Sequence, residues 1–252
     1  MANSPSGETV TERIVRVFET FDTDRTVQTA AEIGRRARLP SSTAHRMVDD
    51  LVKCGLLERD EDQRVRLGMR LWELALRGSR ALRLRQTATP FMQRVQARIQ
   101  EHTQLAVLEN DEALFIERLS HPKAGANITR IAGRLPLHAS ASGLVLLAYS
   151  PEELQERVLA GPLKAVSPET VTDPAQLRRV LAGIRRDGII VAPGSVESVS
   201  TGLAVPVREW RDREVIAALS VVLPRDAPTR PAIEELRAAA AGITTAFGAK
   251  RP

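Results

Sequence analysis

Cysteine is almost missing from this chain of 252 residues, which contains a single example, Cys54. One cysteine excludes an intramolecular disulfide framework and favours a reducing compartment. The four histidines are scattered at positions 45, 102, 121 and 138, and with one cysteine they offer no zinc-binding spacing. We therefore expect no metal and no cofactor, and we expect Cys54 to be a small buried hydrophobic residue.

Long apolar runs are missing too. The longest, from Gly143 to Ala148, is far too short to cross a bilayer. The first ten residues, MANSPSGETV, have neither the basic start nor the apolar core of a signal peptide. These features predict a soluble, cytoplasmic protein that does not bind membranes.

The common catalytic motifs are also missing. The sequence has no GxSxG elbow, no P-loop, no GxGxxG and no HExxH. His138 stands close to Ser140 and Ser142, a grouping that nucleophilic catalysis would use, but a polar loop histidine is the simpler interpretation. We expect no catalytic residues and no enzyme activity.

Lysine is scarce as well, since it supplies only four of the 36 cationic residues. Arginine therefore carries nearly all of the positive charge, and it is the better bidentate partner for phosphate and guanine. The formal net charge of +5 and the pI of about 10.1 are compatible with a polyanionic partner. The length allows two domains, and the 43% hydrophobic content can fill their cores.

The first part of the chain contains three amphipathic helix patterns. Threonine–glutamate capping boxes at 9/12 and 29/32 begin the first two, and the polar stretch DTDRTVQ between them predicts a loop. Pro40 disfavours helical geometry at Leu39, so a turn must precede the next helix. That helix lies in LPSSTAHRMVDDL, where an apolar stripe recurs at i, i+3, i+4 and i+7: Ala44, Met47, Val48 and Leu51.

A short hairpin follows the third helix. Gly55 ends the helix, because glycine accepts the left-handed backbone at this position. The strand-like runs LLER and RVRL then flank DEDQ, a polar hairpin tip. Three helices and a hairpin form a winged helix-turn-helix, which we place at residues 8–69.

The polar start of the third helix predicts a DNA contact. A recognition helix enters the major groove with its N-terminal residues foremost. Serine and threonine at a helix start are also ordinary caps, and exposed arginines are usually solvated. The helix, turn and wing together favour DNA binding, with phosphate contacts from Arg35, Arg59 and Arg64 and base or phosphate contacts from Ser41, Ser42, Thr43, His45 and Arg46.

Beyond residue 69 a helical connector leads to a second domain. Leu71, Leu74 and Ala75 form a stripe that we expect to pack on another subunit, although packing within the same chain is the alternative. Gly78 weakens this helix, and Pro90 marks the start of the next. Strand patterns such as QLAVLE, ALFIERL, GIIVA and EVIAALSVVL then mix with helices. They predict an α+β domain with a largely antiparallel sheet.

Both halves of the chain resemble the IclR family of bacterial transcriptional regulators. The first half matches through AEIGRRARLPSSTAHRMVDDLVKCGLLER, and the second through GRLPLHASASGLVLLA, RRDGIIVA and GLAVPVREWRDREVIAALSVVLP. The resemblance implies a linker helix used in dimerisation over 70–86, a GAF-like effector domain over 87–250, and assembly as dimers or tetramers. It also implies that a small metabolite, often an organic or aromatic acid, alters binding to a roughly palindromic operator.

The resemblance further places six residues around the effector: Ala141, Ser142, Ala192, Gly202, Ser220 and Val222. Ala192, Gly202 and Val222 are less polar than the residues often found there, so we expect a less polar and roomier pocket. The effector is then larger and more apolar than a two-carbon acid. Two alternatives stay open, namely a ligand-independent repressor and an enzyme that processes a small acid.

Overall fold

The computed structural model describes residues 7–22, 24–122, 124 and 131–249. The chain divides into two compact units, residues 1–79 and 80–252, which we call the N-terminal unit and the C-terminal unit. Residues 70–86, expected to form one linker helix, are shared between two helices that meet at Ser79, whose ψ of 111° is extended. Residue 250, the expected end of the effector domain, lies outside the described residues.

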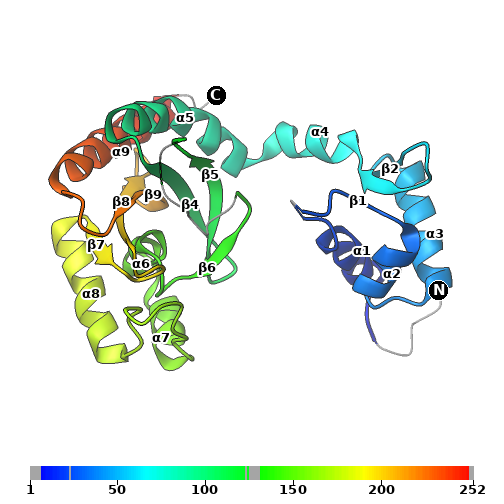
Figure 1. The fold of residues 1–252 in the computed structure, drawn as a ribbon, viewed down its shortest axis with the longest axis horizontal. Coiled ribbons are helices and arrows are strands. Elements are labelled where there is room, and N and C mark those ends of the chain that lie inside the picture. Colours follow the sequence, from blue (N-terminus) through cyan, green and yellow to red (C-terminus); the bar gives the residue numbers. More distant parts are fainter. Residues whose placement is uncertain (1–6, 23, 123, 125–130, 250–252) are drawn as a thin grey trace. The chain divides into compact units, whose positions relative to one another are not determined.

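The N-terminal unit is a bundle of helices with a small sheet (Figure 1). The predicted hairpin is present, and its second strand also pairs with a strand inside DTDRTVQ, which we had expected to be a loop. The sheet order is therefore β1-β3-β2. The elements are α1 (Val10–Glu19), β1 (Val27–Gln28), α2 (Ala30–Arg36), α3 (Ser41–Lys53), β2 (Leu57–Arg59), β3 (Val65–Leu67) and α4 (Met69–Gly78).

The core of this unit lies against the predicted face of α3. Ala44, Met47, Val48 and Leu51 are all buried, and they pack with apolar residues of α1, α2 and the hairpin. Each such valine or leucine contributes roughly 1.5–3 kcal/mol by burial. Gly34 lets α2 approach α3, because a Cβ there would lie 2.8 Å from the Ala44 Cβ. This packing holds the start of α3 at the surface.

Both capping boxes form as the sequence predicts. The Thr9 side chain accepts a hydrogen bond from the Glu12 N–H, and Thr29 does the same for Glu32. Gly55 follows α3 with φ of +73°, the left-handed conformation expected of it. The prediction that Cys54 is buried is wrong, because this residue is exposed at the end of α3. Its carbonyl accepts a hydrogen bond from Arg70 Nη1 at 3.0 Å.

The C-terminal unit is built on a six-stranded antiparallel sheet with the order β6-β5-β4-β9-β8-β7. The α+β class and the antiparallel pairing are confirmed; the short edge strand β6 was not predicted. Its elements are α5 (Arg80–Ile99), β4 (His102–Glu109), β5 (Glu112–Leu119), β6 (Arg134–Pro136), α6 (Ala141–Ala148), α7 (Glu152–Ala160), α8 (Pro174–Asp187), β7 (Ile190–Pro193), β8 (Ser200–Arg208), β9 (Val215–Pro224) and α9 (Arg230–Ala249).

Two apolar cores lie on opposite faces of this sheet. Helices α5 and α9 cover one face, and α6 covers the other with α7 and α8 behind it (Figure 1). All eight residues of α6 are buried, as expected for GLVLLA. Their position matters for function because Ala141 and Ser142, at the N-terminal end of α6, meet Gly202 of β8 and Ser220 of β9 respectively.

Pro90 lies inside α5 rather than at the start of a helix, which corrects the sequence prediction. Proline in a helix interior costs about 3 kcal/mol. Here Leu84, Ala88, Met92 and Val95 of the same helix are buried in one core, and their packing outweighs that cost. None of the helices in the described part of the chain is long and apolar enough to span a membrane.

Candidate functional site

The N-terminal end of α3 is the first candidate site. Ser41, Ser42, His45 and Arg46 are exposed, and Thr43 is half-buried. The residue before the helix is Pro40, which provides no side-chain cap. The first N–H groups of the helix therefore face solvent without the usual side-chain acceptor, which suits them to an anion such as phosphate.

The side chains at this end present different hydrogen-bonding groups. His45 Nδ1 lies 2.9 Å from the Ser41 carbonyl oxygen, so Nδ1 carries the hydrogen and donates it. In the neutral ring Nε2 is then an acceptor. The Arg46 guanidinium has no hydrogen-bond or ion-pair partner among the described residues, so its donors are available to an incoming ligand.

The three predicted phosphate-contacting arginines differ in their surroundings. Arg35 is exposed on α2. Arg59 Nη2 instead lies 2.7 Å from Asp49 Oδ1 of α3. Arg64 lies 3.3 Å from Asp60 and 3.5 Å from Asp62. Both wing arginines are thus paired with acids, and each must exchange a carboxylate for a phosphate in order to contact DNA.

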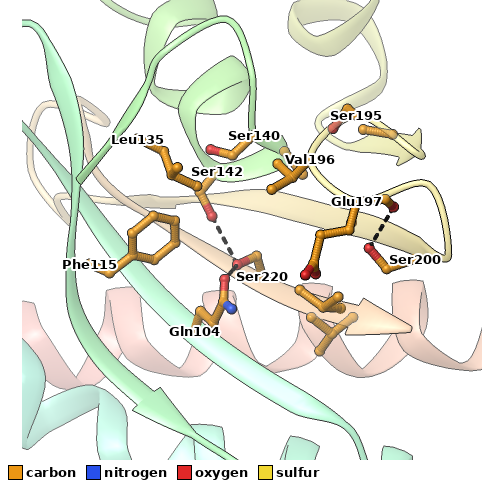
Figure 2. A pocket seen from close by; sticks show the side chains of 15 residues that line it. Gln104, Phe115, Leu135, Ser140, Ser142, Ser195, Val196, Glu197, Ser200 and Ser220 are labelled. Carbon is orange, nitrogen blue, oxygen red and sulfur yellow. Dashed lines mark hydrogen bonds between the residues drawn. The ribbon is translucent and has the colours of Figure 1, made fainter. Parts of the chain in front are cut away.

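The second candidate site is a cavity in the C-terminal unit (Figure 2). All six residues placed there by the family resemblance line it: Ala141, Ser142, Ala192, Gly202, Ser220 and Val222. The other lining residues are Gln104, Phe115, Leu135, Ser140, Ser195, Val196, Glu197, Ser200 and Val221. The site therefore lies between the start of α6, the loop before β8 and the strands β4, β5, β8 and β9.

The start of α6 forms a polar wall of the cavity. Ser140 caps the helix by accepting a hydrogen bond from the Gly143 N–H at 3.0 Å. The Ser142 hydroxyl donates to Ser220 Oγ at 2.8 Å, and Ser220 in turn reaches Gln104 Oε1 at 3.5 Å. Gly143 is required here, because a Cβ would lie 2.5 Å from the Leu137 carbonyl oxygen.

The sequence prediction of a pocket roomier and less polar than those of small-acid binders stays a prediction, and the cavity itself combines polar and apolar surface. Its volume is about 40 Å³, and seven of its fifteen lining residues carry polar side chains. The prediction considered only six positions, whereas the polar groups come mainly from others, such as Gln104, Ser195 and Glu197. Ala192, Gly202 and Val222 do supply apolar surface, as expected.

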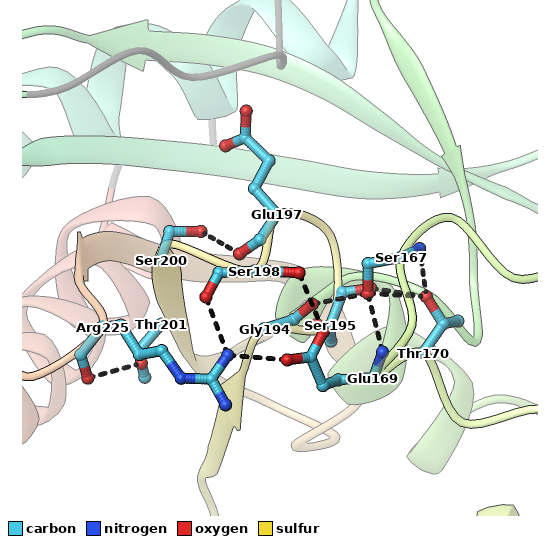
Figure 3. A network of polar contacts seen from close by, with 10 residues as sticks. All are labelled: Ser167, Glu169, Thr170, Gly194, Ser195, Glu197, Ser198, Ser200, Thr201 and Arg225. Atoms are coloured by element: carbon cyan, nitrogen blue, oxygen red, sulfur yellow. Dashed lines mark hydrogen bonds and ion pairs between the residues drawn. The ribbon is translucent and has the colours of Figure 1, made fainter.

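The loop between β7 and β8 is fastened from its outer side (Figure 3). Arg225 Nη1 donates to Glu169 Oε1 at 2.8 Å and to the Ser198 carbonyl at 2.7 Å. The Ser198 hydroxyl donates to the other Glu169 oxygen at 3.0 Å. Arg225 first, and then Ser198, hold the pKa of the Glu169 carboxyl below its usual value of 4.5. These contacts fix the loop that carries Glu197.

His138 has a structural role in this unit. It is buried, and Nε2 donates to the Lys164 carbonyl at 2.9 Å. The hydroxyls of Ser140 and Ser142 are engaged with Gly143 and Ser220 instead. No group of three or more His, Cys, Asp or Glu in the described ranges could hold a metal ion.

Comparisons with known proteins decide the family. A model of the IclR helix-turn-helix domain matches residues 10–61, and a model of the bacterial transcriptional regulator IclR C-terminal region matches residues 79–245. The chain belongs to the IclR family. The HTH-type transcriptional regulator XynR of Escherichia coli is 30% identical over 212 residues, 83% of this chain and 84% of XynR. KipR of Bacillus subtilis is 26% identical over 194 residues, 77% of each chain.

Two solved structures are more similar. An IclR homolog of Microbacterium hydrocarbonoxydans complexed with 4-hydroxybenzoate is 60% identical, with a TM-score of 0.92 over 96% of this chain and 100% of that one. An IclR homolog of another Microbacterium strain is 58% identical, with a TM-score of 0.66 over 97% and 100%. The N-terminal unit thus contains an IclR-type DNA-binding domain, and the C-terminal unit contains the regulator domain of this family.

Proposed function

We propose that this chain is a homo-oligomeric transcriptional regulator of the IclR type whose binding to an operator is altered by an aromatic acid. The observation that carries the DNA-binding part is the exposed, uncapped start of α3 within an IclR helix-turn-helix domain. Helix N-termini bind phosphate, and side chains of the first turns reach base edges. Such a regulator acts in the cytoplasm, where its operator lies.

Different side chains carry affinity and specificity in this proposal. Arg46 is the main base-reading residue, because its guanidinium is exposed and suited to guanine O6 and N7. Arg35 and Arg64 bind phosphate and add affinity with little specificity, and Arg59 does the same when its ion pair with Asp49 opens. Ser41, Ser42, Thr43 and His45 complete the contact surface. Two copies related by a two-fold axis read a roughly palindromic operator.

The cavity in the C-terminal unit is the proposed effector site. A relative 60% identical to this chain was crystallised with 4-hydroxybenzoate, which makes a hydroxybenzoate the first effector class to test. The present cavity of about 40 Å³ is smaller than the roughly 150 Å³ in which benzene binds an engineered protein cavity. Lining side chains must therefore move apart when an aromatic ring enters.

That movement is the proposed origin of regulation. A ligand shifts an equilibrium only when it binds one arrangement better than another. An effector that binds the opened cavity stabilises one arrangement of the assembled chains. The arrangement with bound effector then differs in the spacing of its two recognition helices, which changes the affinity for the operator.

Fluorescence anisotropy with DNA from upstream of the protein's own coding region tests the proposal. We expect tight binding that weakens steeply with salt and that changes when 4-hydroxybenzoate is added. Arg46→Ala should lose about 10- to 100-fold in affinity for the operator, as one bidentate base contact is worth about 1–3 kcal/mol. Lys53→Ala, at the other end of the same helix, should change it by less than about threefold.

The controls separate the two parts of the proposal. A scrambled duplex should bind weakly and equally to wild type and Arg46→Ala. Equal affinity of wild type for both duplexes would reject specific readout by α3. Specific binding that no aromatic acid alters would leave a regulator that works without a ligand.

A further inference from the structure

Glu197 is the only ionisable residue among the described residues that line the cavity. It is half-buried and lies on the loop between β7 and β8. Figure 2 shows its side chain extending from that loop toward Ser220 and Gln104. The carboxylate has no hydrogen-bond or ion-pair partner among the described residues, although the Glu197 backbone carbonyl accepts from Ser200. An acid at this position faces the cavity without a partner of its own.

The direction of this side chain is set by contacts on the far side of the loop. The Ser167 hydroxyl donates to the Gly194 carbonyl at 2.5 Å, and the Thr170 hydroxyl donates to the Ser195 carbonyl at 2.7 Å. These bonds hold the backbone just before Glu197 in place. In Figure 3 the Glu197 carboxylate points away from this network.

The segment after Glu197 is held in the same way. The Ser198 carbonyl and hydroxyl are both engaged, by Arg225 and by Glu169 respectively. The negative charge of Glu169 is balanced by Arg225, whereas no cation lines the cavity near Glu197. Glu169 is thus paired outside the cavity, whereas Glu197 on the loop is left to face the ligand.

The opposite wall has the complementary chemistry. Ser142, Ser220 and Gln104 are buried there on α6 and on strands of the sheet, and the Ser142 hydroxyl donates to Ser220, which donates to Gln104 Oε1. A hydroxyl hydrogen can turn from its serine or glutamine partner to an acceptor on a ligand. A carboxylate on the ligand suits this wall. The ionised carboxylate of Glu197 only accepts, so it requires a donor on the other end of the ligand.

We infer that Glu197 determines effector specificity: it accepts a hydrogen bond from a hydroxyl or amino group at the end of the aromatic acid remote from its carboxylate, and it rejects a second carboxylate there. This inference rests on the proposed function of the cavity as an effector site. A hydrogen bond to an ionised acceptor is about twice as strong as one between neutral groups. A ligand without the donor leaves the Glu197 carboxylate partly desolvated and unpaired, and such sites reject the analogue strongly.

Isothermal titration calorimetry on the full chain tests this with three acids that differ at one end: 4-hydroxybenzoate, 4-methoxybenzoate and benzene-1,4-dicarboxylate. Wild type should prefer 4-hydroxybenzoate over 4-methoxybenzoate by at least about tenfold. Glu197→Gln should reduce this preference to about threefold or less. The same variant should bind the dicarboxylate about tenfold better than wild type does, because a like charge has been removed.

Glu152→Gln is the matched control, since it removes one exposed carboxylate from the same unit outside the cavity. It should behave as wild type with all three acids. A purely structural role for Glu197 would weaken every ligand alike, and that pattern would overturn the inference. A preference for the hydroxyl that Glu197→Gln leaves unchanged would overturn it too, with the effector site intact. Binding of none of the acids to wild type would reject the proposed effector class together with this inference.

Discussion

At the scale of single residues, the ion pair between Asp49 and Arg59 links α3 to the wing and limits what Arg59 can do. Arg59 Nη2 is 2.7 Å from the Asp49 carboxylate, and Nη1 donates to the Gln63 carbonyl at 3.2 Å. Replacing Asp49 by Asn should release the guanidinium for a phosphate. We expect the slope of log affinity against log salt to become steeper by about 0.9, the value for one added phosphate contact.

The neighbouring acid provides the control for this prediction. Asp50 lies on the same helix, and its closest cation is Lys53 at 3.9 Å. Asp50→Asn removes the same charge without releasing Arg59, so it should raise affinity slightly and leave the slope unchanged. Anisotropy titrations at four salt concentrations measure both slopes. Equal slopes for the two variants would mean that Arg59 does not reach phosphate.

The residues of the cavity show how far sequence could predict a site. Six lining positions followed from the family resemblance, and all six meet at one cavity. Glu197 was missed because the direction of a loop side chain depends on distant partners, here Ser167 to Thr170 and Arg225. Cys54 was misjudged for a similar reason: hydrophobicity favours burial, but its position at the end of α3 exposes it.

At the scale of elements, the capping box of α2 stabilises the start of the helix that packs against α3. Hydrogen bonds from the Thr29 backbone N–H and hydroxyl hold the pKa of Glu32 below 4.5. Thr29→Ala should cost about 1 kcal/mol by removing the helix cap, which corresponds to about fivefold faster amide exchange in α2. Hydrogen–deuterium exchange measured by mass spectrometry reports this locally. Thr9→Ala removes the equivalent cap of α1, so the fast exchange should move to that helix.

The same capping box predicts a dependence on pH. A lowered pKa in the folded state stabilises the protein above pH 4.5, and this contribution is lost as the pH falls through the lowered pKa. Glu32→Gln should therefore melt at a lower temperature than wild type at pH 7. The difference should narrow steadily on titration toward pH 3. A constant difference across this range would assign the effect to packing rather than to the charge of Glu32.

Elements with strong local signals were predicted well, and those that depend on distant pairing were not. Capping boxes and apolar stripes located α1, α2 and α3, and Gly55 follows α3 in the left-handed conformation as expected. Strand β1 has two residues and exists only because β3 pairs with it, through Gln28 with Val65 and Val27 with Arg66. Proline favours the first turn of a helix, which predicted a helix start at Pro90, but the packing of α5 overrides this local preference.

At the scale of the whole molecule, α4 is a helix whose apolar side chains are not buried within a single chain. None of its residues is buried, and Met69, Trp72, Leu74 and Leu76 are all exposed. A soluble helix normally buries its apolar side chains, and exposed apolar patches of this kind are typical of interaction surfaces. We therefore expect α4 to pack on a second copy, as the sequence pattern of the connector predicts, and regulation to require that assembly.

Trp72 is the residue through which this expectation is best tested, because its side chain is 60% exposed and large aromatic residues often dominate interfaces. Trp72→Glu buries a charge in the expected interface, so it should convert the assembly to single chains of 27.6 kDa in light scattering. Trp72→Phe keeps the apolar surface and should preserve the assembly, and Glu73→Ala on the same helix should do so as well.

Because a single chain engages only one half-site, Trp72→Glu should also lose at least about 100-fold in operator affinity while half-site binding survives. An unchanged mass for Trp72→Glu would place the interface elsewhere and leave α4 without this role.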